Sequence, residues 1–237
     1  MDSFTPDTHP IPLSIPCAQG PAHARLHGEL ALLPEAPGLV VLAYAATALD
    51  ERERVIAGIL RHAGLSTLLI NLVAREEEHY PDVHNNVPLL AHRLVDVLDL
   101  IKHRMLMGEL PPQPLGLCAA NASSPVVVRV AALRDHDIAA VVCRAGLIDL
   151  AGLLYLRSLE APLLQIIEEN DTPQRLAAQR AQKELHGAHA LRTIPEIGFE
   201  IAGSSGFEAE VRETTQWFLD HFERRKPGRN RPLRRTG

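Results

Sequence analysis

Short apolar runs alternate with longer amphipathic segments along most of the chain. A continuous apolar run, as in 39–43 and 65–72, is typical of a strand that is buried on both faces of a sheet. Segment 87–107 instead repeats its apolar residues at helical intervals. The pattern predicts strands at 39–43, 65–72, 115–118, 138–143, 162–167 and 190–194, helices at 50–63, 87–107, 126–133, 173–185 and 208–222, and a short helical turn at 149–156.

Strands that alternate with helices in this way predict an α/β protein built from βαβ units. Such units give a mostly parallel twisted sheet with helices on both faces, and ligands bind at the carboxyl edge of its strands. Residues 11–33 alternate in polarity and predict two further strands, at 13–17 and 25–33, with a turn at 19–21. We expect these two strands to form an N-terminal antiparallel hairpin at the edge of the sheet.

The 237 residues suit one domain, which we place at 11–223, after a flexible N-terminus at 1–10. The last segment, 224–237, holds seven Lys or Arg and no acid, and we expect it to be a disordered basic tail. The rest of the chain keeps 17 basic and 29 acidic side chains. An acidic body disfavours nucleic-acid binding, except weakly through the tail.

Composition favours a cytoplasmic protein. No apolar run approaches the roughly 20 residues that span a bilayer, and the polar start of the chain does not resemble an export signal. The three cysteines, Cys17, Cys118 and Cys143, are odd in number, and two of them lie in expected strands. They are typical of reduced core residues rather than of a disulfide framework.

The segment 114–125, PLGLCAANASSP, is the candidate functional site. It passes from an apolar strand through small residues into a helix, which is the setting of the nucleophile elbow G-x-S-x-G. Laid over this motif, residues 119–123 put Asn121 at the nucleophile position. An amide cannot form the acyl ester of the usual covalent mechanism.

Over about residues 11–222 the chain resembles the dienelactone hydrolase branch of the α/β-hydrolases. The resemblance lies in the segments GLVVLAYAATA, LRHAGLSTLLINL, DIAAVVCRAGLIDLAG and APLLQIIEENDTP, in the closing helix, and in the spacing from Asn121 to Ile138. It implies ester or lactone hydrolysis by a triad whose acid falls on Asp171. The triad histidine falls at Phe199, and the histidine and glycine of the oxyanion loop fall at Tyr44 and Ala45. The triad is therefore expected to be degenerate.

The remaining candidates complete a possible binding site. Backbone N–H groups at Ala46 and Ala122 could still serve as oxyanion donors, so the ligand-binding candidates are Tyr44, Ala45, Ala46, Asn121 and Ala122. Tyr44 could donate to a ligand or fill the space of the missing histidine. No cofactor motif is present, and His79 and His84 with Asp82 match no standard metal spacing.

Two hypotheses follow. The first is a pseudoenzyme that binds a small molecule or a protein. The second is a residual or repurposed ester or lactone hydrolase that uses Cys118, Ser123 or a water activated by Asp171. Cys118 is also a plain core residue in this pattern, and Asp171 also suits the cap of the helix that follows. Members of the branch joined to phosphoribosyltransferases imply a protein partner, and a homodimer stays open.

Overall fold

The computed structural model describes residues 10–18, 24–46, 51–134, 136–197 and 204–224. The expected N-terminal segment and basic tail lie almost wholly outside these residues. Within them, the strands form one sheet in the order β1-β2-β4-β3-β5-β6-β7-β8. The strands are β1 (Ile11–Pro16), β2 (Arg25–Ala31), β3 (Leu39–Tyr44), β4 (Ser66–Asn71), β5 (Leu115–Ala120), β6 (Ile138–Arg144), β7 (Leu163–Glu168) and β8 (His189–Ile194).

The sheet is parallel except at one edge, which confirms the predicted fold class. Strands β1 and β2 pair antiparallel, and β2 pairs antiparallel with β4, so the N-terminal hairpin extends the sheet beyond β4. All pairs from β4 to β8 are parallel. Strands β3, β4 and β6 are buried along their whole length, as continuous apolar runs require.

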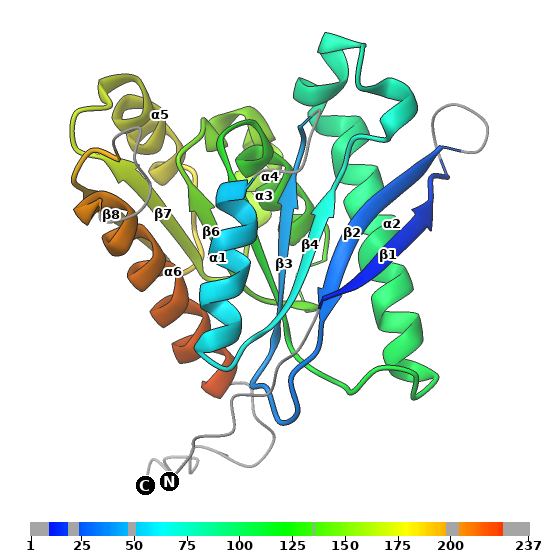
Figure 1. The fold of residues 1–237 in the computed structure, drawn as a ribbon. Helices are drawn as coiled ribbons and strands as arrows, with labels where there is room; N and C mark the ends of the chain where they lie inside the picture. Colours follow the sequence, from blue (N-terminus) through cyan, green and yellow to red (C-terminus); the bar gives the residue numbers. More distant parts are fainter. Residues whose placement is uncertain (1–9, 19–23, 47–50, 135, 198–203, 225–237) are drawn as a thin grey trace, which may run out of the picture.

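Helices cover both faces of the sheet (Figure 1). On one face α1 and α6 enclose a core that includes Ile56 and Phe218. On the other face α2 and α3 pack over the second core, with α4 and α5 beside them. The helices are α1 (Glu51–His62), α2 (Val87–Leu106), α3 (Ser124–Leu133), α4 (Leu153–Ser158), α5 (Thr172–Gln182) and α6 (Ser205–Arg224).

The structure differs from the predicted elements mainly at their ends. Helix α3 begins at Ser124 rather than 126, because Pro125 fits the first turn of a helix, where its missing N–H costs no hydrogen bond. The polar segment 75–86, which lies between a predicted strand and a predicted helix, contains the 3-10 turns η1 (Arg75–Glu77) and η2 (Pro81–Asn85). Two more such turns are η3 (Asn121–Ser123) and η4 (Ile148–Ala151). Among the described residues, no helix is both long and apolar enough to cross a membrane.

Candidate functional site

The turn between β5 and α3 has the backbone geometry of an elbow. Strand β5 ends at Ala120, Asn121 adopts a left-handed conformation with φ of 50°, and α3 begins three residues later. Asn tolerates this conformation better than most residues with a Cβ. Gly146 packs against the turn, because a Cβ at that residue would lie 2.2 Å from the Asn121 carbonyl oxygen. Asn121 therefore stands exposed at the crest of a tightly packed bend.

A small cavity of about 140 Å³ lies beside this bend. Its polar lining includes Asn121 itself, Glu168 at the end of β7 and Gln174 on α5. Its apolar lining is formed by Ala120, Ala145, Ile166, Ile194 and Ile197. The cavity thus opens at the carboxyl edge of the strands, where this class of sheet places its ligands.

Four charged residues, which we call the buried ion cluster (Arg52, Glu53, Arg144 and Glu210), also line this cavity. Arg144 ends β6 and is only 1% exposed. Its Nη2 pairs with Glu53 on α1, and its Nη1 lies 3.7 Å from Oε2 of Glu210 on α6. Arg52 Nη2 donates to the same Oε2 at 2.8 Å. The cluster therefore ties α1, β6 and α6 together beneath the elbow.

The carboxylates compensate the buried charge of Arg144. Burial alone lowers the pKa of its guanidinium, but the nearby Glu53, Cys118 and Glu210 outweigh this effect and raise the pKa well above its usual value. Sequence reasoning missed the cluster. The available signal was a charged residue, Arg144, directly at the end of a buried apolar strand.

Asp171, the predicted triad acid, caps α5. Its Oδ1 accepts a hydrogen bond from Gln174 N at 2.9 Å, and its Oδ2 accepts one from Gln174 Nε2 at 2.7 Å. The side-chain oxygen of Gln174 in turn accepts from Gly146 N at 3.0 Å. Asp171 is thus connected to the elbow through Gln174 and Gly146. Phe199, at the predicted histidine position, lies outside the described residues.

The two rival nucleophiles are both buried. Cys118 is 0% exposed, and Arg144 Nε lies 3.4 Å from its Sγ. Burial raises the pKa of the Cys118 thiol to about 11, so the thiol stays protonated near neutral pH. Ser123 is 3% exposed, and neither residue lines the cavity beside Asn121.

The burial of Cys118 predicts a simple labelling pattern. At pH 8 the native protein should react quickly with a thiol reagent such as DTNB at Cys17 alone, because Cys17 is partly exposed whereas Cys118 and Cys143 are buried. In denaturant, all three cysteines should react. Cys17→Ser should remove the fast phase. A fast phase that survives this change and disappears in Cys118→Ala would show an accessible Cys118.

The oxyanion-loop candidates lie at the end of β3, where the chain is held by Asn71. Asn71 Nδ2 donates to the Ala46 carbonyl at 2.8 Å, and its Oδ1 accepts from Ala46 N at 3.4 Å. The carbonyl of Ala45 lies 3.4 Å from His84 Nδ1. Tyr44 faces the α1 side of the sheet and lines a different cavity, together with Asn71. Of the ligand-binding candidates, Asn121 and Ala122 both lie on η3. Tyr44 lines the other cavity and not the one beside Asn121.

His79 and His84 have different neighbours in the structure. The His84 ring contacts the Ala45 carbonyl. The His79 ring instead lies beside the ring of Tyr80, with ring centroids 5.6 Å apart. Throughout the part of the chain that the structure describes, no three His, Cys, Asp or Glu side chains are arranged to hold a metal ion.

Comparisons with known proteins agree on the fold. No family model matches the chain. The dienelactone hydrolase from Anabaena variabilis superimposes with a TM-score of 0.81 at 27% identity, over 90% of this chain and 98% of its own. Est1E from Butyrivibrio proteoclasticus matches with a TM-score of 0.69 at 13% identity, over 90% of this chain and 99% of its own. Carboxyl esterase 2 from Tuber melanosporum matches with a TM-score of 0.68 at 12% identity, over 93% and 89%.

Two curated relatives carry a different kind of name. Proteins from two strains of Mycobacterium tuberculosis, each named "Putative phosphoribosyl transferase", are 32% identical to this chain over 193 residues. The match covers 80% of this chain but only 43% of each relative. The chain therefore spans less than half the length of these proteins.

Proposed function

We propose that this chain, which has the α/β-hydrolase fold and is similar to a dienelactone hydrolase, is a non-catalytic member of that superfamily that binds a small molecule. The observation that carries the proposal is Asn121 at the crest of the elbow. In a hydrolase this position presents the group that attacks the ester carbonyl. A carboxamide has neither a removable proton nor the nucleophilicity that this step needs.

The neighbours of Asn121 support the same conclusion. Cys118 is buried in the core between the sheet and helices α1 and α6, and its thiol is protonated. Ser123 is buried at the end of η3. Both oxygens of the Asp171 carboxylate accept hydrogen bonds from Gln174, so the capping bonds compete with activation of a water molecule. The alternative, a residual or repurposed hydrolase, would need one of these three groups to leave its present partners or surroundings.

The name of the longer relatives does not lead to the same proposal. They match over 43% of their length, whereas the hydrolase-fold structures match about 90% of this chain with nearly all of their own. We therefore base the proposal on the fold and on the residues at the elbow. The remaining polar lining of the cavity, with Glu168 and Gln174, can hydrogen-bond a ligand without transforming it.

An activity assay tests the proposal directly. With a panel of p-nitrophenyl esters and lactones, we expect no turnover above the buffer rate, because among the described residues no serine, cysteine or histidine lines the cavity. The same panel is run on Cys118→Ala and Asp171→Asn, with Cys17→Ala as the matched control. A working enzyme typically has a turnover number of about 1 per second or more. The proposal would be overturned by such a turnover that disappears in either of the first two variants but not in the control.

A further inference from the structure

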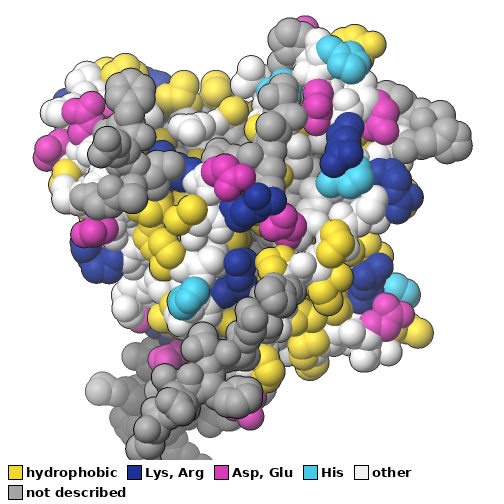
Figure 2. Space-filling model, in the orientation of Figure 1, with side chains coloured by type: hydrophobic (Ala, Val, Ile, Leu, Met, Phe, Trp, Pro, Cys, Tyr) yellow, Lys and Arg dark blue, Asp and Glu magenta, His cyan; other side chains and the backbone are white. Residues whose placement is uncertain are grey.

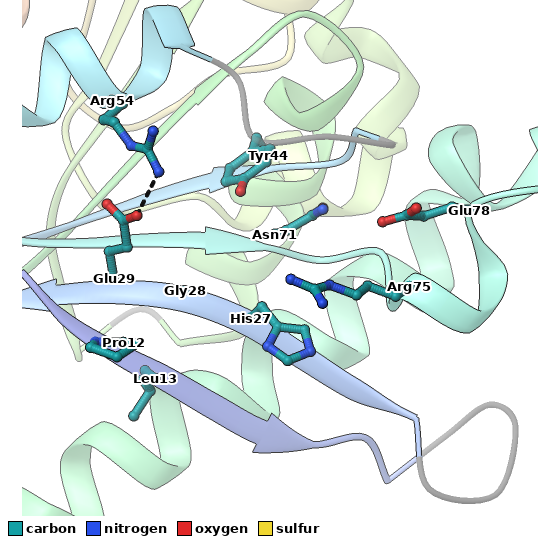
Figure 3. A pocket seen from close by; sticks show the side chains of 10 residues that line it. All are labelled: Pro12, Leu13, His27, Gly28, Glu29, Tyr44, Arg54, Asn71, Arg75 and Glu78. Carbon is teal, nitrogen blue, oxygen red and sulfur yellow. Dashed lines mark hydrogen bonds and ion pairs between the residues drawn. The ribbon is translucent and has the colours of Figure 1, made fainter.

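A second and larger cavity, of about 440 Å³, lies on the α1 side of the sheet near the N-terminal hairpin (Figure 3). Helix α1 covers β3 and β4 on this face, whereas β1 and β2 extend the sheet beyond the helix (Figure 1). The walls come from β1, β2, the ends of β3 and β4, α1 and the turn η1. This cavity is lined by none of the residues around Asn121.

The strand β2 supplies the floor and two polar groups. His27 and Glu29 alternate along β2 and both line the cavity, and Gly28 lies between them. A Cβ on Gly28 would lie 2.5 Å from the Leu69 carbonyl oxygen, so this position of β2 approaches β4 too closely for a side chain. Because successive side chains of a strand point to opposite faces, a side chain at Gly28 would point away from His27 and Glu29, towards the face of Leu26 and Leu30.

One pair of opposite charges in the cavity is already matched. Arg54 on α1 donates from Nη2 to Glu29 Oε1 at 2.8 Å and from Nη1 to Glu51 Oε1 at 3.0 Å. Glu29 is the main cause that raises the pKa of Arg54. Of these three side chains, only Arg54 and Glu29 line the cavity, and their charges offset each other there.

The turn η1 and the residue that follows it bring a second pair of opposite charges to the cavity, Arg75 and Glu78. Among the residues that the structure describes, neither side chain has a hydrogen bond or an ion pair. Arg75 extends towards His27, and the Glu78 carboxylate points into the space beside Asn71 (Figure 3). One cation and one anion thus face the same cavity.

The backbone that carries these two charges is held from below. Glu77, between them, is buried and pairs with Arg93 Nη2 at 2.7 Å. Arg93 Nη1 also donates to the Leu72 carbonyl at 3.0 Å, which fixes the turn to the end of β4. Arg75 and Glu78 therefore project from a turn whose backbone is anchored by a buried ion pair.

We propose that this cavity binds a small zwitterion of the α-amino acid class. The ligand carboxylate lies against Arg75 and His27, and the ligand ammonium lies against Glu78, with the Tyr44 hydroxyl near the side chain of the ligand. Charge-assisted hydrogen bonds of this kind are shorter and stronger than neutral ones.

The charge pattern argues for a zwitterion over a simple ion. A purely anionic ligand would meet Glu78 as well as Arg75, and a purely cationic one would meet Arg75 as well as Glu78. Basic and acidic side chains also lie intermixed over this face of the molecule (Figure 2). No single-sign surface gathers an ion of one charge here. The proposal does not depend on whether the elbow is catalytic, because the two cavities share no lining residue.

Isothermal titration calorimetry with the twenty free L-amino acids tests the proposal at pH 7 and low ionic strength. We expect at least one to bind with a Kd below about 1 mM. Its carboxamide, which lacks the carboxylate, and its des-amino acid, which lacks the ammonium, should each bind at least tenfold more weakly. Absence of binding by all twenty, or equal binding of the carboxamide or the des-amino acid, would overturn the proposal.

Matched variants locate the site. Arg75→Gln and Glu78→Gln should each weaken binding at least tenfold. The first removes the partner of the ligand carboxylate, and the second removes the partner of the ligand ammonium. Glu76→Gln, on the same turn but outside the cavity, and Arg212→Gln on α6 should leave the affinity unchanged. All four side chains lie at or near the surface, and circular dichroism checks that the fold is kept. Equal affinity in all four variants would place the ligand elsewhere and contradict the assignment.

Discussion

Replacing Arg144 by methionine is expected to lower the free energy of unfolding by about 3–5 kcal/mol. The change keeps much of the side-chain volume but leaves Glu53 and Glu210 buried without the cation that compensates them. Whole domains are stable by only about 5–15 kcal/mol, so the variant should unfold at a much lower denaturant concentration. Chemical denaturation followed by circular dichroism measures the effect.

A matched surface arginine provides the control. Arg180 also pairs with an acid, Asp149, at 2.7 Å, but its side chain is 61% exposed. Exposed pairs contribute at most about 1 kcal/mol, so Arg180→Met should change stability little. The partner change Glu53→Gln, made in the wild type and in Arg144→Met, completes a double-mutant cycle. If the two losses simply add, the charges do not act as a unit, and our account of the cluster is wrong.

The fold could be predicted from the sequence because its signals are local. A strand buried on both faces must be apolar throughout, and β3 and β6 show this in the sequence itself. The elbow could also be placed, because a strand end, a run of small residues and a helix start follow each other in one short segment. Asn121 therefore stands where the sequence predicts the crest.

The buried ion cluster could not be found in the same way. Arg144 and Glu53 are 91 residues apart, and only the packing of α1 on the sheet brings them together. From the sequence alone, Glu53 on an amphipathic helix and Arg144 at the end of a strand are each expected to be exposed to solvent. Nothing in the local pattern shows that both are buried.

Tyr44 shows a second limit. The sequence places it correctly at the end of β3, but successive side chains of a strand point to opposite faces. Which face Tyr44 takes depends on the register of the whole sheet and on which helix covers it. The structure directs it to the α1 side and the larger cavity, which is also lined by the charged residues Glu29, Arg54, Arg75 and Glu78.

The combined change Asn121→Ser with Phe199→His is expected to produce ester hydrolysis well above the rate of the unchanged protein. Serine at the left-handed crest would present its hydroxyl at the position where the superfamily presents its nucleophile. Histidine at 199 would supply the general base that the resemblance assigns there. A positioned base contributes typically about 10²–10⁴-fold, so the double variant should exceed the wild type at least about 100-fold with p-nitrophenyl acetate.

Neither single change should produce this rate. Serine alone has no base, and histidine alone has no nucleophile, so the two changes act as a unit. The new activity should also stay well below that of a natural esterase, because Asp171 accepts its hydrogen bonds from Gln174 and is not yet the partner of an imidazole. Gln174→Ala in the double variant would release one of these bonds and should raise the rate further.

The single variants also decide what a negative or unexpected result means. If Asn121→Ser alone were as active as the double variant, a base other than residue 199 would already face the elbow, and the non-catalytic assignment would be wrong. If the double variant were folded and yet inactive, residues 121 and 199 would not be the missing pair. Only activity that requires both changes agrees with an intact elbow that has lost its nucleophile and its base.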